Sequence, residues 1–295
     1  MSVAAEPIRR PSGTPAARIV RFISRAPVHL ALIGIGALWL VPTLGLAITS
    51  FRPRDEIQAS GWWTSLNDFA FTLHNYDLVL HNAKMGSSFL NSIMITVPST
   101  ILPLVIGAAA AYAFSWIKFP FRDTIFLIIV ALMVVPIQMA LVPLLRLFRD
   151  LGLADWFVGI WLAHTAFGLP LAVFLLRNFF ITLPKDLIEA ARMDGASNLA
   201  IFRRIVIPLS VPALASFAIF QFLWVWNDLL VALLFLGRGD NTILTVALQG
   251  LQGQTGAGRE LIASAGFVTI IVPLIVFLSL QRFFIRGMTA GAVKG

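Results

Sequence analysis

Hydrophobic residues gather in long stretches that contain no charged side chain. Six of these windows reach the roughly 20 residues that a helix needs to cross a hydrocarbon core about 30 Å thick. Each is expected to be a helix, because lipid offers the backbone no hydrogen-bond partner and nothing alternates like a barrel strand. The sequence therefore predicts an all-α, polytopic membrane protein with six transmembrane helices. The windows are Ala26–Phe51, Met85–Ile117, Thr124–Leu145, Trp156–Leu176, Ile205–Asn227 and Leu261–Gln281.

Composition supports this prediction and excludes several classes of activity. Hydrophobic residues make up 58% of the chain and charged residues 12%, against roughly 45–50% and about 25% in ordinary globular domains. The absence of cysteine excludes disulfides and cysteine-based metal or redox sites. No lysine follows a glycine, so the chain lacks the G-x-x-x-x-G-K-[ST] loop that cradles ATP phosphates. We therefore expect no catalytic site, cofactor or metal in this chain.

Basic residues predict the orientation of the helices. If the N-terminus lies inside, fifteen of the 22 Lys and Arg residues fall in inner segments and seven in outer ones. The positive-inside rule then places both termini in the cytoplasm. The net charge of +8 follows from this topology and requires no nucleic acid. The inner residues are Arg9, Arg10, Arg18, Arg21, Arg25, Lys118, Arg122, Arg177, Lys185, Arg192, Arg203, Arg204, Arg282, Arg286 and Lys294.

A charged segment, residues 182–207, separates the fourth and fifth windows. Pro184 marks the start of a short helix, and Gly195 can adopt the left-handed conformation that ends one. Ser197 or Asn198 can cap a second short helix. The first helix has apolar residues on more than one side, so a partner protein is needed to cover it. These residues are Leu187, Ile188, Ala191 and Met193.

The spacing within this segment carries a family resemblance. Glu189-Ala190-Ala191, Gly195 four positions later and Ile205-Val206-Ile207-Pro208 resemble the EAA loop of bacterial ABC importer permeases, although Leu is usual at position 207. From about Ala26 to its end, the chain is similar to the carbohydrate-uptake, MalG-type group. Supporting stretches are Asn91-Ser92, Val97–Thr100, Ala110–Phe114, Pro136–Gln138, Phe220–Asp228 and Thr289–Gly295.

The resemblance implies an organisation and a set of partners. Residues 1–25 would be a cytoplasmic tail, and residues 26–295 the permease domain, with the EAA coupling loop at 182–207. The chain would lie in the bacterial inner membrane beside a second, MalF-type permease. Two ATPase subunits would bind ATP and Mg, and an extracytoplasmic binding protein would deliver the sugar. The ATPase-coupling residues would be Glu189, Ala190, Ala191, Asp194 and Gly195.

Polar residues inside the predicted spans are candidates for a translocation path. Gln221, Trp224 and Asp228 recur at i, i+3 and i+7, which places them on one helix face. An aromatic ring can stack on a sugar, and amide or carboxylate groups can bond its hydroxyls. The alternative is hydrogen bonding between helices together with an aromatic belt, with the partner permease holding the sugar. Further polar candidates are Asn91, Gln138, His164 and Asn227.

The segment 237–260 is the predicted outer loop before the last span. Its glycines and amides suit contacts with sugar hydroxyls, and the resemblance implies that it reaches into the sugar cleft of the binding protein. The alternative is a simple connector. The residues expected to face the binding protein are Gln249, Gly250, Gln252, Gly253 and Gln254.

Two questions stay open at the level of sequence. The resemblance favours an α-glucoside such as maltose or trehalose, but glucosylglycerol and glycerol phosphate are alternatives. An ion-coupled secondary transporter is a different class, and it would need an acidic site within the membrane. Only Asp228 lies near a span interior, toward one edge.

Overall fold

The computed structural model describes residues 15–66, 70–82, 85–237, 239, 241–252 and 258–292, and within these ranges the side chains from residue 26 to 281 except those of Leu66, Asn82 and Gln252. Every regular element within these ranges is helical. Four helices are long and apolar enough to cross a membrane, and there are six spans if each of two bent helix pairs counts as one. The predicted all-α membrane fold is confirmed. The four long helices are α1 (Pro15–Phe51), α4 (Met85–Trp116), α7 (Phe157–Phe180) and α14 (Arg259–Ala292).

The third predicted span is not one helix, which corrects the continuous reading of Thr124–Leu145. It bends by 102° around Val135 and Pro136. Proline has no backbone N–H, and its ring disfavours helical geometry at the preceding residue. Val135 accordingly has an extended ψ of 119°. The pieces are α5 (Arg122–Ala131), η3 (Leu132–Val134) and α6 (Ile137–Asp150).

The fifth predicted span, which contains the charge-free window Ile205–Asn227 and is expected to reach about Leu236, is also interrupted. A 77° bend at Ser210 separates its entry helices from α11, and a non-helical break at Asn227–Asp228 ends α11. Pro212 follows the first bend directly, and proline is a usual cause of such bends. The pieces are α9 (Asn198–Ile201), η4 (Phe202–Val206), α10 (Ile207–Leu209), α11 (Val211–Trp226) and α12 (Leu230–Leu236).

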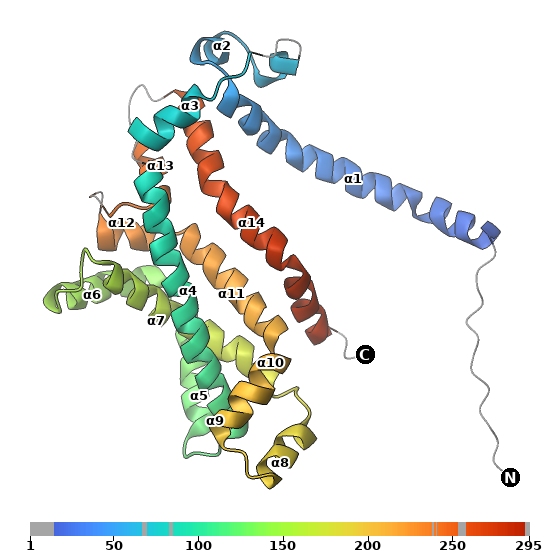
Figure 1. Cartoon of the computed structure of the whole chain (residues 1–295), viewed down its shortest axis with the longest axis vertical. Helices are drawn as coiled ribbons and strands as arrows, with labels where there is room; N and C mark the ends of the chain where they lie inside the picture. The colour runs from blue at the N-terminus through green and yellow to red at the C-terminus, as the bar shows by residue number, and fades with distance from the viewer. Residues whose placement is uncertain are drawn as a thin grey trace.

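The remaining short helices lie at the two ends of the bundle (Figure 1). At one end, α8 and α9 form a hairpin, and we call this the hairpin end. At the other, α13 lies close to α3, and we call this the α13 end. Helix α13 lies within the predicted outer loop. Its apolar residues are buried, so this loop is partly a packed helix. The short helices are α2 (Arg54–Ala59), η1 (Trp62–Leu66), α3 (His74–Asp77), η2 (Leu78–Asn82), α8 (Lys185–Met193) and α13 (Leu244–Gln252).

Helix α4 is central to the packing. It contacts α7, α11 and α13, and α14 packs against α11. Helix α1 diverges from the bundle and contacts it through its C-terminal part (Figure 1). Leu38 and Trp39 on α1 are 70% and 77% exposed, as suits a helix that faces lipid or another subunit.

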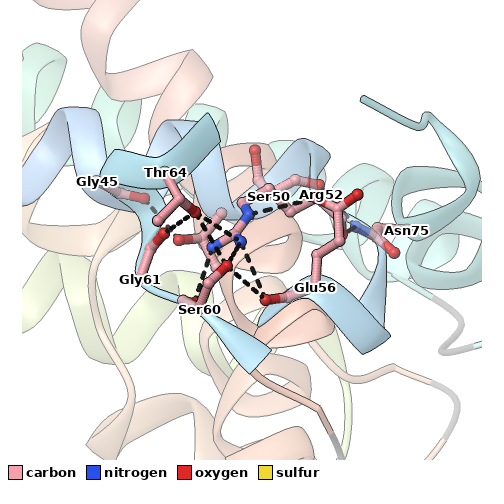
Figure 2. A network of polar contacts seen from close by, with 9 residues as sticks. Gly45, Ser50, Arg52, Glu56, Ser60, Gly61, Thr64 and Asn75 are labelled. Atoms are coloured by element: carbon pink, nitrogen blue, oxygen red, sulfur yellow. Dashed lines mark hydrogen bonds and ion pairs between the residues drawn. The ribbon is translucent and has the colours of Figure 1, made fainter. Parts of the chain in front are cut away.

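The C-terminal end of α1 is fixed by a buried polar network around Arg52 (Figure 2). The Arg52 guanidinium is 2% exposed and donates to the Glu56 and Ser60 carbonyls at 3.0 and 3.2 Å. Asn75 Nδ2 and Ser264 Oγ both donate to the Ser50 carbonyl at 3.0 Å. This carbonyl belongs to the last turn of α1, where no backbone partner is available within the helix. The network therefore ties α1 to α3 and α14.

Three prolines inside the long helices are tolerated because neighbouring helices replace the lost hydrogen bond. Each proline frees the carbonyl four residues earlier, and an unsatisfied carbonyl in hydrocarbon costs several kcal/mol. In each case a side-chain N–H from another helix donates to that carbonyl. The bonds are Trp161 Nε1 to Met94 O (2.9 Å) for Pro98, Gln221 Nε2 to Ser99 O (3.1 Å) for Pro103, and Trp226 Nε1 to Thr269 O (2.9 Å) for Pro273.

This pairing predicts an energetic coupling between Gln221 and Pro103. Gln221→Leu is expected to lower the free energy of unfolding by about 1–3 kcal/mol, because the buried Ser99 carbonyl loses its donor. In a Pro103→Ala background the loss should be smaller, since the introduced alanine supplies a backbone N–H to the same carbonyl. Denaturant titrations in detergent on the four variants of this double-mutant cycle measure the difference. Equal losses in both backgrounds would contradict the pairing.

Candidate functional site

The hairpin between α7 and α11 has the local structure that its sequence predicts. Pro184 directly precedes α8, and Gly195 has a φ of +79° just beyond its end. Ser197 Oγ accepts a hydrogen bond from the Ala200 N–H at 3.3 Å and so caps α9. The predicted helix end and cap are both confirmed. The chain thus reverses direction over a few residues, and the hairpin stands as a compact unit.

One side of the hairpin is anchored to the rest of the protein. Ile188, Ile201 and Val206 are at most 1% exposed and belong to one apolar cluster with Leu176 and Phe180 of α7. These bulky contacts, in a cluster that also contains Ala108 and Ala111 of α4, fix the hairpin to the ends of α4 and α7. A displacement of the hairpin therefore moves packed side chains of the bundle, because a close-packed interface transmits strain.

The other side of the hairpin is open. The expected coupling residues Glu189, Ala190, Asp194 and Gly195 are exposed, and Ala191 is half-buried. Apolar side chains surround them without cover from this chain. Leu187 is 47% exposed, Leu199 55% and Met193 88%. Small residues, acids and exposed aliphatic groups together form a surface suited to a protein partner.

Polar contacts also join the hairpin to the end of α4. Arg192 Nη2 donates to the Trp116 carbonyl at 2.7 Å, which satisfies an acceptor in the last turn of α4. Tyr112 Oη donates to Asn198 Oδ1 at 3.3 Å, and the centroid of the Tyr112 ring lies 5.2 Å from that of the Phe202 ring. The Arg192 guanidinium thus bonds to the protein's own α4.

A second cluster of polar residues lies where α11 ends. The Trp224 ring packs edge-on against His164 of α7, with ring centroids 5.1 Å apart. His164 Nε2 lies 3.7 Å from Asp228 Oδ2. The Asp228 carboxylate accepts hydrogen bonds from the Val231 and Ala232 N–H groups at 3.3 and 2.9 Å. Asp228 therefore caps α12, and His164, a weaker candidate from sequence, is the residue that joins Trp224 to it.

The other path candidates are dispersed. Gln221 is 3% exposed and its amide is used between helices, as the alternative interpretation of this face expects. Asn227 is exposed and donates to the Leu223 carbonyl of its own helix at 2.7 Å. Gln138 is exposed in the first turn of α6. The structure thus brings together Trp224 and Asp228 but not all five residues.

The predicted binding-protein segment is described only in part. Gln249 and Gly250 lie within α13, Gln252 is its last residue, and Gly253 and Gln254 lie outside the described residues. The start of α13 is bonded to α4, because Ser92 Oγ accepts from the Leu244 N–H at 2.9 Å. Asn91 Nδ2 donates to the Thr242 carbonyl at 3.1 Å. Asn91 and Ser92 therefore hold the α13 end in place.

A large groove of about 600 Å³ lies between the broken third span and α7. Its lining side chains, which include Ile137, Leu144 and Phe167, are all apolar. It offers no side-chain polar group to sugar hydroxyls. Among the described residues, no group of three His, Asp or Glu side chains is placed to hold a metal ion.

The helical bundle, its hairpin and its broken spans define a transporter permease fold. The alginate-importing bacterial ABC transporter has this fold, with a TM-score of 0.64 over 91% of this chain and 99% of that one, at 14% identity. Residues 103–290 match the model of the family described as binding-protein-dependent transport system inner membrane component. The chain belongs to this family, and it is a permease subunit of a binding-protein-dependent ABC importer.

Curated relatives extend over nearly the whole chain. The osmoprotective compounds uptake permease protein GgtD of Synechocystis sp. is 51% identical, covering 94% of this chain and 95% of that protein. The alpha-glucoside transport system permease protein AglG of Rhizobium meliloti is 40% identical, covering 91% and 97%. These matches confirm the resemblance to carbohydrate-uptake permeases.

The hydrogen bonds at Asp228 predict that its contribution to stability depends on its side-chain oxygens as acceptors rather than on its negative charge. Asp228→Ala should lower the free energy of unfolding by about 0.5–2 kcal/mol, because the first N–H groups of α12 lose their acceptor. Asp228→Asn keeps one acceptor oxygen and should retain most of the stability and the uptake rate. Denaturant titration and transport assays on both variants test this. Equal loss of uptake in the Ala and Asn variants would instead indicate that the charge itself is required.

Proposed function

We propose that this permease forms half of the translocation path of a glucoside importer and that its hairpin, residues 182–207, couples the path to an ATPase subunit. The observation that carries the proposal is the two-sided hairpin. Ile188 anchors it to the bundle, whereas Met193 and its neighbours leave an apolar, acidic surface uncovered. A surface of this kind, outside the long helices, fits a cleft in a protein partner.

The proposed mechanism follows from this arrangement. ATP binding closes the two ATPase subunits and displaces the hairpin with them. Because Ile188, Ile201 and Val206 are packed in one cluster with side chains of α4 and α7, the displacement becomes a rigid-body movement of the bundle. The path then opens outward to accept sugar, and ATP hydrolysis resets it. The second permease, of MalF type, forms the other wall of the path.

The proposed orientation follows the positive-inside rule. The hairpin, both termini and the tail 1–25 lie in the cytoplasm, and residues 26–295 form the permease domain in the inner membrane. The α13 end then faces the extracytoplasmic binding protein. Gln249 and Gly250 are the described residues of the segment proposed to contact it.

For the path itself, we assign a lining role to Trp224, with Asn227, Asp228 and Gln138 as secondary candidates. Trp224 is half-buried at the end of α11, so part of its ring is open to a passing sugar. Gln221 is the weakest candidate, since the Ser99 carbonyl already occupies its amide. The rival class, an ion-coupled transporter, would require Asp228 to bind the ion, but its oxygens cap α12.

The proposed substrate is a neutral glucoside, such as maltose, trehalose or glucosylglycerol. Two relatives support this class, one with alpha-glucoside transport and one with osmoprotective compounds uptake in its name. Glycerol phosphate is the less favoured alternative, because a phosphate group requires cationic partners. The six charge-free windows of this chain provide none.

The substrate is tested on the cognate binding protein, which delivers it. Calorimetric titration with maltose, trehalose, glucosylglycerol and glycerol phosphate is expected to give tight binding only for glucosides. The same ranking should appear when the solute-loaded binding protein stimulates ATP hydrolysis by the reconstituted complex. Selective binding of glycerol phosphate would overturn the assignment.

The coupling role is tested at Gly195 and Glu189. Gly195→Asp forces a side chain into a left-handed conformation, which costs about 1–2 kcal/mol. Glu189→Lys reverses an exposed charge. Each variant should insert normally, but the amount of sugar taken up per ATP hydrolysed should fall about tenfold or more.

The matched control is Gly152→Asp, which imposes the same strain at a φ of +69° away from the hairpin. Like Gly195, Gly152 has no atom within 4 Å of an added Cβ. This control should retain coupled uptake, measured by sugar uptake and phosphate release in the same proteoliposomes. Full sugar-stimulated ATP hydrolysis and full uptake in both hairpin variants would refute the coupling role.

A further inference from the structure

Helix α4 is bonded at both of its ends to elements that lie outside the long helices. It contains 32 residues without interruption, which corresponds to a length of about 48 Å at about 1.5 Å per residue. The hydrocarbon core is about 30 Å thick. Helix α4 is therefore longer than the core is thick, and its two ends meet the hairpin and α13.

At the hairpin end, α4 is held by side-chain hydrogen bonds in its last two turns. Arg192 of α8 bonds the Trp116 carbonyl at 2.7 Å, and Tyr112 bonds Asn198 of α9 at 3.3 Å. Both helices of the hairpin are thus linked to α4, which is not their neighbour along the chain. These links add to the direct chain connections through α7 and α10.

At the α13 end, α4 provides the polar groups that begin α13. Ser92 Oγ accepts from the Leu244 N–H, the first N–H of α13, and Asn91 bonds the Thr242 carbonyl just before it. Phe89 also packs edge-on against Trp226, with ring centroids 6.0 Å apart. The start of α13 is consequently bonded to α4, in addition to its packing against α14 and the hydrogen bond from Thr245 Oγ1 to the Asp228 carbonyl.

Between its ends, α4 is locked to two further helices. Trp161 of α7 and Gln221 of α11 bond its proline-freed carbonyls. At Gly107 the backbones of α4 and α7 approach so closely that an added Cβ would lie 2.5 Å from the Ala172 Cβ. The proline sites, which would otherwise be points of bending, are therefore braced from outside. Helices α4, α7 and α11 therefore form one packed unit, which we call the block.

We infer that α4 is the rigid link that carries the movement of the hairpin across the membrane to α13. Arg192 and Tyr112 are the positioning residues at one end, and Asn91 and Ser92 at the other. The inference rests on the coupling role proposed for the hairpin, and it adds the route of that coupling. The direct route through α10 bends by 77° at Ser210, where movement can be absorbed. Helix α4 has no such break, and it is bonded directly to the start of α13; α7, which is also unbroken, packs along α4 and belongs to the same block.

The test uses a single reporter on the α13 side. The chain has no cysteine, so one introduced thiol labels uniquely. Gly239 is exposed, and an added Cβ there meets no atom within 4 Å, which makes Gly239→Cys a suitable site for an environment-sensitive fluorophore. The labelled subunit is assembled with its second permease and ATPase subunits in lipid nanodiscs. The signal is the change in fluorescence when a non-hydrolysable ATP analogue is added.

The variants break the link at each end. Arg192→Met keeps an unbranched, flexible stem but removes the donor to Trp116, and Ser92→Ala removes the acceptor for α13. Each should reduce the ATP-dependent signal about three- to tenfold while the ATPase subunits stay bound to the complex. Arg192→Lys and Ser92→Thr retain a donor or a hydroxyl and should recover much of the signal.

Two matched controls accompany them. Lys118→Met removes an exposed positive charge two residues beyond α4, and Ser65→Ala removes a buried hydroxyl that has no hydrogen-bond partner in the described structure. Both should leave the signal unchanged. Because Arg192 is exposed, a folding defect is not expected in its variant even if Ser92→Ala lowers stability.

The outcomes separate this inference from the proposed function. If Gly239→Cys responds to the ATP analogue equally in the parent chain, Arg192→Met and Ser92→Ala, the hairpin couples but α4 is not the link. If the parent chain gives no response and Gly195→Asp leaves uptake per ATP unchanged, the coupling role of the hairpin is itself wrong. Loss of the signal in both link variants, with recovery in Arg192→Lys, supports α4 as the link.

Discussion

A backbone carbonyl without a hydrogen-bond partner is costly in hydrocarbon, and this constraint determines how the long helices of this permease pack. Pro98, Pro103 and Pro273 each free one carbonyl within a long helix. In every case an indole or amide N–H from a neighbouring helix occupies it. The prolines therefore specify which helices must be neighbours, because a wrong neighbour would leave the carbonyl unsatisfied.

The same constraint explains why the bundle combines a rigid part with broken helices. At Pro103, where a donor is present, the helix continues through the proline. At Pro136 the backbone leaves helical geometry and the chain turns by 102°. The continuous helices α4 and α7 form the packed centre. The interrupted ones place short segments, turns and caps at the two ends, where polar residues such as Asp228 find backbone partners.

The hairpin follows a different rule because it lies outside the long helices. Ile188 is covered by the bundle, whereas Met193 on the same helix is 88% exposed. A helix with exposed apolar residues beside an anchored side is suited to a second protein that covers the open side. The anchored side gives the hairpin its position in this subunit, and the open side is the surface on which the proposed coupling depends.

The sequence by itself determined the class of fold, the approximate spans and the local form of the hairpin. Charge-free windows, Gly195 and Ser197 act over a few residues, so their effects can be deduced from neighbours in the chain. The tertiary structure alone decided which prolines break a helix and which are braced, since the donors lie tens of residues away. It also brought His164 to Asp228 and gave Gln221 a structural partner in Ser99. Contacts of this range depend on how helices pack, and no local pattern encodes them.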